Sequence, residues 1–73
     1  MLSAHAVLDI LQANGFKQLR QSGSHITMRR DELDAFGHIV DTVTVIVPNH
    51  REIAIGTLSS IVRQSRLARD LFE

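Results

Sequence analysis

The stretch Arg20–His25 holds residue types and a spacing that could do acid–base chemistry. It reads Arg-Gln-Ser-Gly-Ser-His, and Gly23-Ser24 is a turn signal, because glycine reaches positive φ without steric cost and serine can bond its own backbone. Short segments that read as strands lie on either side. A turn there places His25 at the start of the second strand, where its side chain is held rigidly and stays open to water. That position suits a group that exchanges protons with a substrate.

The surroundings of this stretch are basic, although the chain has no net charge. Eight Lys and Arg residues balance eight Asp and Glu residues, whereas nucleic-acid binders usually carry excess positive charge. Between Lys17 and Arg30 there are four basic residues and no acidic one, and Asp31–Asp34 then supplies three acids. The predicted hairpin therefore carries a local positive field on a neutral molecule.

Length and composition favour one small domain, residues 1–73. The chain is 44% hydrophobic with a mean hydropathy of +0.03, which is too apolar for disorder. It has no cysteine, so disulfides and thiolate metal sites are excluded. No apolar run approaches the roughly 20 residues of a membrane helix, and the N-terminus lacks a secretory-signal pattern. We expect a cytoplasmic protein with no membrane segment.

The apolar spacing predicts a first helix over Ala4–Ala13. Its apolar stripe recurs at i, i+3, i+4 and i+7, and consists of Ala4, Val7, Leu8 and Leu11, widened by Ile10. Ser3 is the expected N-cap. Asn14-Gly15 is the expected end, since glycine is the favoured left-handed cap.

Two strands are predicted to flank the Gly23-Ser24 turn. The first covers Phe16–Gln21, with Phe16 and Leu19 as its apolar anchors. The second covers Ile26–Arg30. Alternation puts Ile26 and Met28 on one of its faces, and His25, Thr27 and Arg29 on the other.

The remaining elements follow from turn signals and β-branched residues. Asp31–His38 is predicted to be a loop, and Ile39–Val47 a strand that Pro48 ends. A second helix is expected from Gly56-Thr57 to Ser65. The finer expectations are Thr57 as its cap, Ile53 and Ile55 as anchors before it, and a short C-terminal helix over Leu67–Phe72 that packs Leu67 and Leu71. The order α-β-β-β-α predicts an α+β fold with a three-stranded antiparallel sheet and both helices on one face.

Taken together, four segments resemble the HicA toxin family. They are Asn14–Phe16, Arg20–His25, Val45–His50 and Ile55–Gln64. HicA proteins are small mRNA interferases of type II toxin–antitoxin pairs, with a fold similar to the double-stranded-RNA-binding domain. The resemblance implies that His25 is the catalytic residue, that mRNA is the substrate and that a HicB-type antitoxin covers the active face. This chain departs from the family in its zero net charge and in a first helix without lysine.

The residues can support RNA cleavage without a metal ion. A 2′-hydroxyl must lose a proton, the departing 5′-oxygen must gain one, and the phosphoryl charge must be stabilised. Histidine suits either transfer, since an imidazole ordinarily has a pKa of about 6.5. Arginine grips two phosphate oxygens at once. We therefore expect catalysis by His25, with contacts to RNA from Arg20, Ser24, Arg29 and Lys17. His50 is a candidate for the second proton carrier.

One other interpretation stays open. A lone histidine near a strand turn is more often structural or merely exposed, so the chain could be a non-catalytic RNA-binding or protein-binding module of the same fold. Zero net charge favours that module, and His25 in its motif favours the nuclease. We expect no cofactor and no metal site, because the four histidines show no close pair at ligand spacing.

Overall fold

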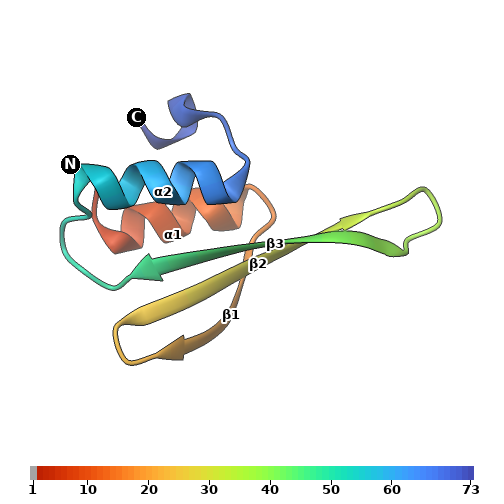
Figure 1. Ribbon diagram of the computed structural model, residues 1–73, viewed down its shortest axis with the longest axis horizontal. Helices are drawn as coiled ribbons and strands as arrows, with labels where there is room; N and C mark the ends of the chain where they lie inside the picture. The colour runs from red at the N-terminus through yellow and green to blue at the C-terminus, as the bar shows by residue number, and fades with distance from the viewer. Residues whose placement is uncertain (1) are drawn as a thin grey trace.

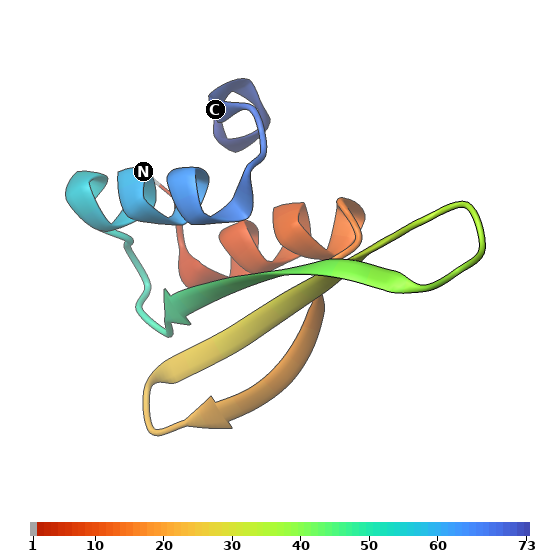
Figure 2. The same ribbon diagram turned by 45° about the vertical axis from the view of Figure 1, so that its right-hand side comes forward.

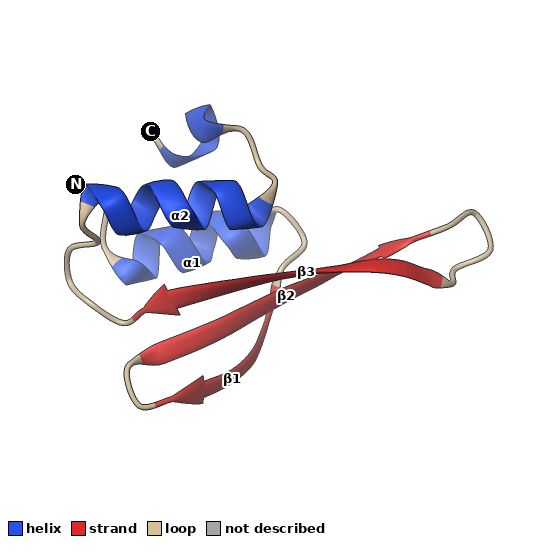
Figure 3. Ribbon diagram, viewed as in Figure 1, coloured by secondary structure: helices blue, strands red, loops and turns tan. Residues whose placement is uncertain are grey.

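Two helices cover one face of a three-stranded antiparallel sheet in the computed structural model, which describes residues 2–73 (Figures 1 and 3). The elements in order are α1 (Ala4–Ala13), β1 (Lys17–Ser22), β2 (His25–Leu33), β3 (Ile39–Pro48), α2 (Ile55–Ser65) and a 3₁₀ turn, η1 (Arg69–Phe72). The strand order is β1-β2-β3, so β2 is central. The predicted α+β class and the order α-β-β-β-α are confirmed.

Helix α1 begins and ends where the sequence predicts. The Ser3 hydroxyl accepts a hydrogen bond from the Ala6 N–H at 3.1 Å, which satisfies one free amide of the first turn. Val7 and Leu11 are fully buried against the sheet. Gly15 then turns the chain with φ +90°, a conformation that side chains other than glycine rarely adopt.

The core lies between the helices and one face of the sheet. Its buried apolar residues are Ala4, Val7, Leu11, Phe16, Ile26, Met28, Val43, Val45, Val47, Ile53, Ile61, Val62 and Phe72. Ile26 and Met28 are on the predicted face. Phe16 is also buried as expected, and the Arg30 guanidinium lies 4.8 Å from its ring centroid. Leu19, in contrast, is 51% exposed, so its predicted role as a core anchor is wrong.

Strand β2 is longer than predicted, because Asp31–Leu33 belongs to it and not to a loop. The loop covers residues 34–38 alone. The acidic residues are tolerated in the strand because each finds a partner. Arg29 Nε and the Thr42 hydroxyl both donate to Asp31 Oδ1, at 2.9 and 3.1 Å, and Glu32 Oε1 lies 3.3 Å from Arg30 Nη2.

Helix α2 begins earlier than predicted. Its N-cap is Ala54, without a side-chain cap, so Thr57 lies inside the first turn. Ile53 is buried as expected, but Ile55 is 73% exposed because it starts the helix on the solvent side. At the other end Arg66 closes the helix in the left-handed region, with φ 61°.

The C-terminal segment forms the short helix expected there, as a 3₁₀ turn. Phe72 supplies its buried contact, whereas Leu71 is 45% exposed. The prediction that Leu71 packs back is therefore wrong. Leu67 is partly buried and packs against the core as expected. Within residues 2–73, no helix combines the length and the apolar character of a membrane span.

The β2–β3 hairpin projects beyond the helices and β1 (Figures 1 and 2). Arg66 ties it to α2, because Nη1 of this residue lies 2.7 Å from Asp41 Oδ2 and 3.6 Å from Glu32 Oε1. Beside the helices, the outer edge of β3 also contacts α2, because the Ile46 N–H donates to Gln64 Oε1 at 3.4 Å. The hairpin is thus attached to α2 and its C-cap at two places, near Asp41 and at Ile46.

The Arg66–Asp41 pair predicts a pH-dependent attachment of the hairpin. The hydrogen bond from Arg66 lowers the pKa of Asp41, helped by the Thr42 N–H. A carboxyl with a lowered pKa stabilises the folded state above its ordinary pKa of about 3.9, and this contribution is lost as the pH falls below that value. Asp41→Asn should therefore speed amide exchange in the outer β2–β3 ladder at neutral pH.

Hydrogen-exchange NMR measures this effect, and the difference from the original chain should close in acid. Asp70→Asn is the matched control, because Asp70 makes no ion pair within residues 2–73. Equal exchange of Asp41→Asn and the original chain at neutral pH would contradict the prediction.

Candidate functional site

The open face of the sheet, away from the helices, brings together the residues singled out in the sequence. Ser22 lies opposite His25, Arg20 opposite Thr27, and Lys17 opposite Arg29. Residues directly opposite each other share a face of an antiparallel pair. Lys17, Arg20 and Arg29 are therefore on the same face as His25, as a basic group on neighbouring strands.

His25 has a fixed backbone and a free ring. As the first residue of central strand β2, it pairs with Ser22 on one side and Pro48 on the other. Its side chain is exposed, and the ring makes no hydrogen bond or ion pair with any other residue in the range 2–73. A rigid backbone with an unoccupied imidazole is what a proton-transfer group needs.

The turn before His25 is held from both sides. Gly23 adopts φ 58°, and its carbonyl accepts from Gln21 Nε2 at 3.0 Å. The Ser24 carbonyl accepts from the Asn49 N–H at 2.6 Å. The Ser24 side chain is exposed beside His25. The turn residues thus fix the position of the backbone that carries the imidazole of His25.

A β-bulge explains how both basic residues of β1 reach the open face. The register shifts between Gln18 and Arg20, so Leu19 is the extra residue. Lys17 and Arg20 are three positions apart, and simple alternation would put them on opposite faces. The bulge places both on the face of His25. In the sequence, the imperfect alternation of apolar and polar residues over Lys17–Ser22 is the one sign of this bulge.

The basic side chains differ in how far their charge is already compensated. Arg29 forms an ion pair with Asp31, Nε to Oδ1 at 2.9 Å, and this hydrogen bond lowers the pKa of the Asp31 carboxyl. Lys17 and Arg20 are exposed and form no ion pair within the described chain, residues 2–73. Their charges are available to an anionic ligand.

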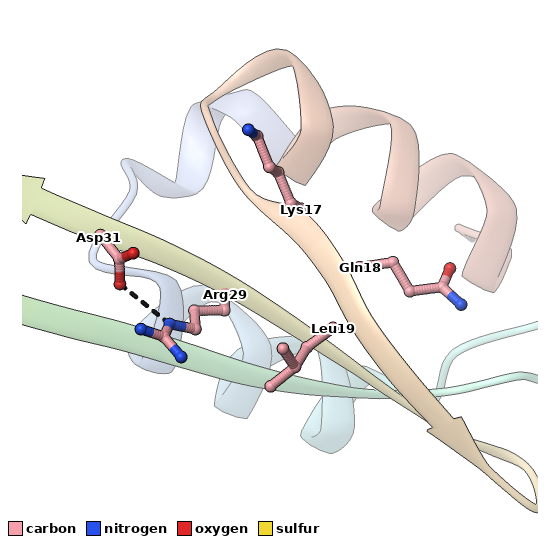
Figure 4. A pocket seen from close by; sticks show the side chains of 5 residues that line it. All are labelled: Lys17, Gln18, Leu19, Arg29 and Asp31. Atoms are coloured by element: carbon pink, nitrogen blue, oxygen red, sulfur yellow. Dashed lines mark hydrogen bonds and ion pairs between the residues drawn. The ribbon is translucent and has the colours of Figure 1, made fainter.

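A pocket of about 300 Å³ lies on the β1–β2 ladder (Figure 4). Its lining residues are Lys17, Gln18, Leu19, Arg29 and Asp31. Figure 4 shows the Leu19 side chain beside the Arg29–Asp31 pair. Arg29 is four residues from His25 along the strand, roughly 13 Å at 3.3 Å per residue. Gln18, Leu19 and Asp31 were not expected at the site. The bulge at Leu19 and the extension of β2 to Asp31 account for two of them.

The candidate second proton carrier, His50, lies at the same end of the molecule. It follows β3, two residues after the Pro48 that pairs with His25. Its carbonyl accepts from the Ala4 N–H at 2.9 Å, so its backbone closes the start of α1, while the residue as a whole is exposed. Among residues 2–73, no group of three or more His, Asp or Glu side chains is placed to hold a metal ion.

Comparison with known proteins gave one match to a protein family. The family model described as HicA toxin of bacterial toxin–antitoxin matches residues 4–67, a range that includes every site residue above. No curated protein and no solved structure matched the chain.

Proposed function

This chain belongs to the HicA toxin family of bacterial toxin–antitoxin systems, and on that basis we propose that it is a metal-independent endoribonuclease that cleaves mRNA in the cytoplasm. Toxins of this family are generally ribonucleases. Its role as a toxin implies an antitoxin partner, which we propose to be of the HicB type. The observation that carries the proposal is an exposed imidazole, free of competing partners and fixed at a turn beside cationic side chains.

His25 carries one of the two proton transfers of the reaction. The 2′-oxygen of a ribose loses its proton and bonds to the adjacent phosphorus. The bond from phosphorus to the 5′-oxygen breaks, and that oxygen takes up a proton. The products are a 2′,3′-cyclic phosphate and a 5′-hydroxyl. An imidazole can accept or donate a proton near neutral pH, so His25 can serve either transfer, and His50 is the candidate for the other.

Arg20 is the best placed cation for the reacting phosphate. It lies opposite Thr27, two residues from His25 on the same face, whereas Lys17 and Arg29 lie near the pocket farther along the strands. We assign those two to a flanking phosphate, and the Ser24 hydroxyl to a hydrogen bond near the reacting one. A guanidinium with no carboxylate partner contributes more to phosphate binding than one already paired.

The assignment of Arg20 predicts a loss of RNA affinity with a changed salt dependence. In a His25→Ala background that leaves RNA intact, Arg20→Ala should weaken binding of single-stranded RNA about tenfold and reduce the slope of log K against log salt by about 0.7. Fluorescence anisotropy over a salt series measures both quantities. Arg63→Ala is the matched control, since Arg63 lies on α2 and should leave affinity and slope unchanged. Equal values for Arg20→Ala and Arg63→Ala would contradict the assignment.

Inducible expression tests the proposed function in cells. Growth arrest with loss of mRNA is expected from the original chain, and neither is expected from His25→Ala at the same level of soluble protein. A toxin that acts on another target would arrest growth and leave mRNA intact.

The zero net charge favours a second candidate function, a non-catalytic RNA-binding or protein-binding module of the same fold. Soluble expression with normal growth and intact mRNA would support it. Such a module would bind its partner but would not cleave RNA. Measuring both properties on the same purified protein therefore distinguishes the two functions.

A further inference from the structure

The outer end of the β2–β3 hairpin carries apolar side chains that the reaction does not use. Leu33 is 59% exposed, Phe36 85%, Ile39 57% and Val40 64%. We call these four residues the hairpin end. They lie on the part of the hairpin that extends past the helices (Figures 1 and 2). Neighbouring exposed apolar side chains of this size are typical of an interaction surface.

The hairpin end is held in one shape. Oδ1 of Asp34 accepts from the N–H groups of Phe36 and His38 at 2.8 and 2.9 Å, and the Asp34 N–H donates to the His38 carbonyl at 2.9 Å. The rings of Phe36 and His38 lie 6.3 Å apart. A surface that is already ordered loses less conformational entropy when a partner binds.

The charges around the hairpin end favour a protein partner over RNA. The segment 31–42 contains four acidic residues and no lysine or arginine. Asp31 is paired with Arg29, and both Glu32 and Asp41 are paired with Arg66. No cationic charge is left over there for phosphate, and RNA binding depends on such charge. Apolar contact with paired charges at the rim is typical of protein interfaces.

Beyond Arg29, β2 has no β1 partner, and the residues on this open edge disfavour pairing with a second copy. Arg30, Asp31 and Glu32 follow one another in this part of the strand, and charged side chains along an edge block strand pairing between chains. The hairpin end is, in contrast, continuous with the site. Leu33 is eight residues from His25 on β2, and an even separation puts both side chains on the same face of the strand. Ile39 lies opposite Leu33.

We propose that the hairpin end is a second docking surface for the antitoxin. One protein partner covers the face of His25 with carboxylates near Lys17 and Arg20, and extends along the hairpin to place apolar side chains on Phe36 and Leu33. The inference rests on the proposed function in one respect, the antitoxin as the protein that covers the His25 face. Phe36 is the expected anchor, because an exposed aromatic side chain on a rigid support is the usual centre of such an interface.

The test measures how fast complexes with the purified HicB-type antitoxin of the same gene pair dissociate. All variants carry His25→Ala, so that they can be produced. Phe36→Ala should speed dissociation about 30-fold, and Leu33→Ser about tenfold. Leu71→Ala is the matched control, because Leu71 is an exposed apolar residue of η1 and should change the rate less than about twofold. The variants should unfold at the same temperature as the original chain, since the substituted side chains are exposed.

Three results would overturn the proposal. The first is equal dissociation rates for Phe36→Ala, Leu33→Ser and Leu71→Ala. The second is self-association of the free chain that Phe36→Ala abolishes, which would make a second copy the occupant. The third is a loss of RNA affinity in Phe36→Ala with unchanged antitoxin dissociation. The readout contains no cleavage step, so a failure of the proposed nuclease activity would show in RNA assays alone and leave these rates as they are.

Discussion

Replacing His25 with alanine is expected to lower RNA cleavage about 10²- to 10⁴-fold, the range that general acid–base catalysis contributes. The side chain is exposed and has no partner among residues 2–73, so its removal breaks no contact of the fold. His25→Gln should lose as much activity, because an amide can hydrogen-bond but cannot exchange protons near neutral pH. Single-turnover cleavage of a labelled RNA, with the antitoxin absent, measures the effect.

The matched control for this prediction is His5→Ala. His5 is an exposed histidine on α1, 3.5 Å from Asp9, and its loss should leave the cleavage rate unchanged. The assignment of His25 would be wrong if His25→Ala and His25→Gln both cleaved RNA at the original rate while showing the original circular dichroism. A fall in rate accompanied by unfolding would be separated from a catalytic loss by the same spectra.

Replacing Phe16 with alanine is expected to remove about 3–5 kcal/mol of folding stability. The ring is 2% exposed, and the Arg30 guanidinium covers it at 4.8 Å from the centroid. Removing it leaves a cavity and uncovers the stem of Arg30. Small domains have a total stability close to this loss, so the variant should be largely unfolded at 37 °C.

Urea unfolding followed by far-ultraviolet circular dichroism measures this loss, since the chain has no tryptophan or tyrosine to report by fluorescence. Phe36→Ala makes the same chemical change at a ring that is 85% exposed, and should alter stability by no more than about 0.5 kcal/mol. Similar midpoints for the two variants would show that Phe16 is not a core residue.

Features that depend on nearby residues were predictable from the sequence. Ser3 caps α1, and Gly23 turns the chain with φ 58°, because capping and turn chemistry act within three or four residues. The alternation of Ile26 and Met28 correctly gave the buried face of β2. The exposed position of His25 follows from that same alternation.

Features that depend on distant partners were not predictable. Asp31 and Glu32 look like loop residues until Arg66 and Thr42 are brought beside them by the fold. The bulge at Leu19 depends on how β1 meets β2, and it decides whether Lys17 and Arg20 share a face. Helix α2 starts at Ile55 without a capping side chain, directly after the buried Ile53, so capping chemistry could not locate its start.

The separation of His25 from the packed layer has a consequence for how this gene can vary. A substitution at an interior position such as Val45 would change how many copies of the chain are folded in a cell. Under the proposed function, each folded copy would keep its full rate of cleavage. Under the proposed function, a substitution of His25 on the outer surface of the sheet would change the rate and leave the number of intact copies alone. Under the proposed function, the number of folded toxin molecules and the rate of each molecule therefore depend on different residues of the chain.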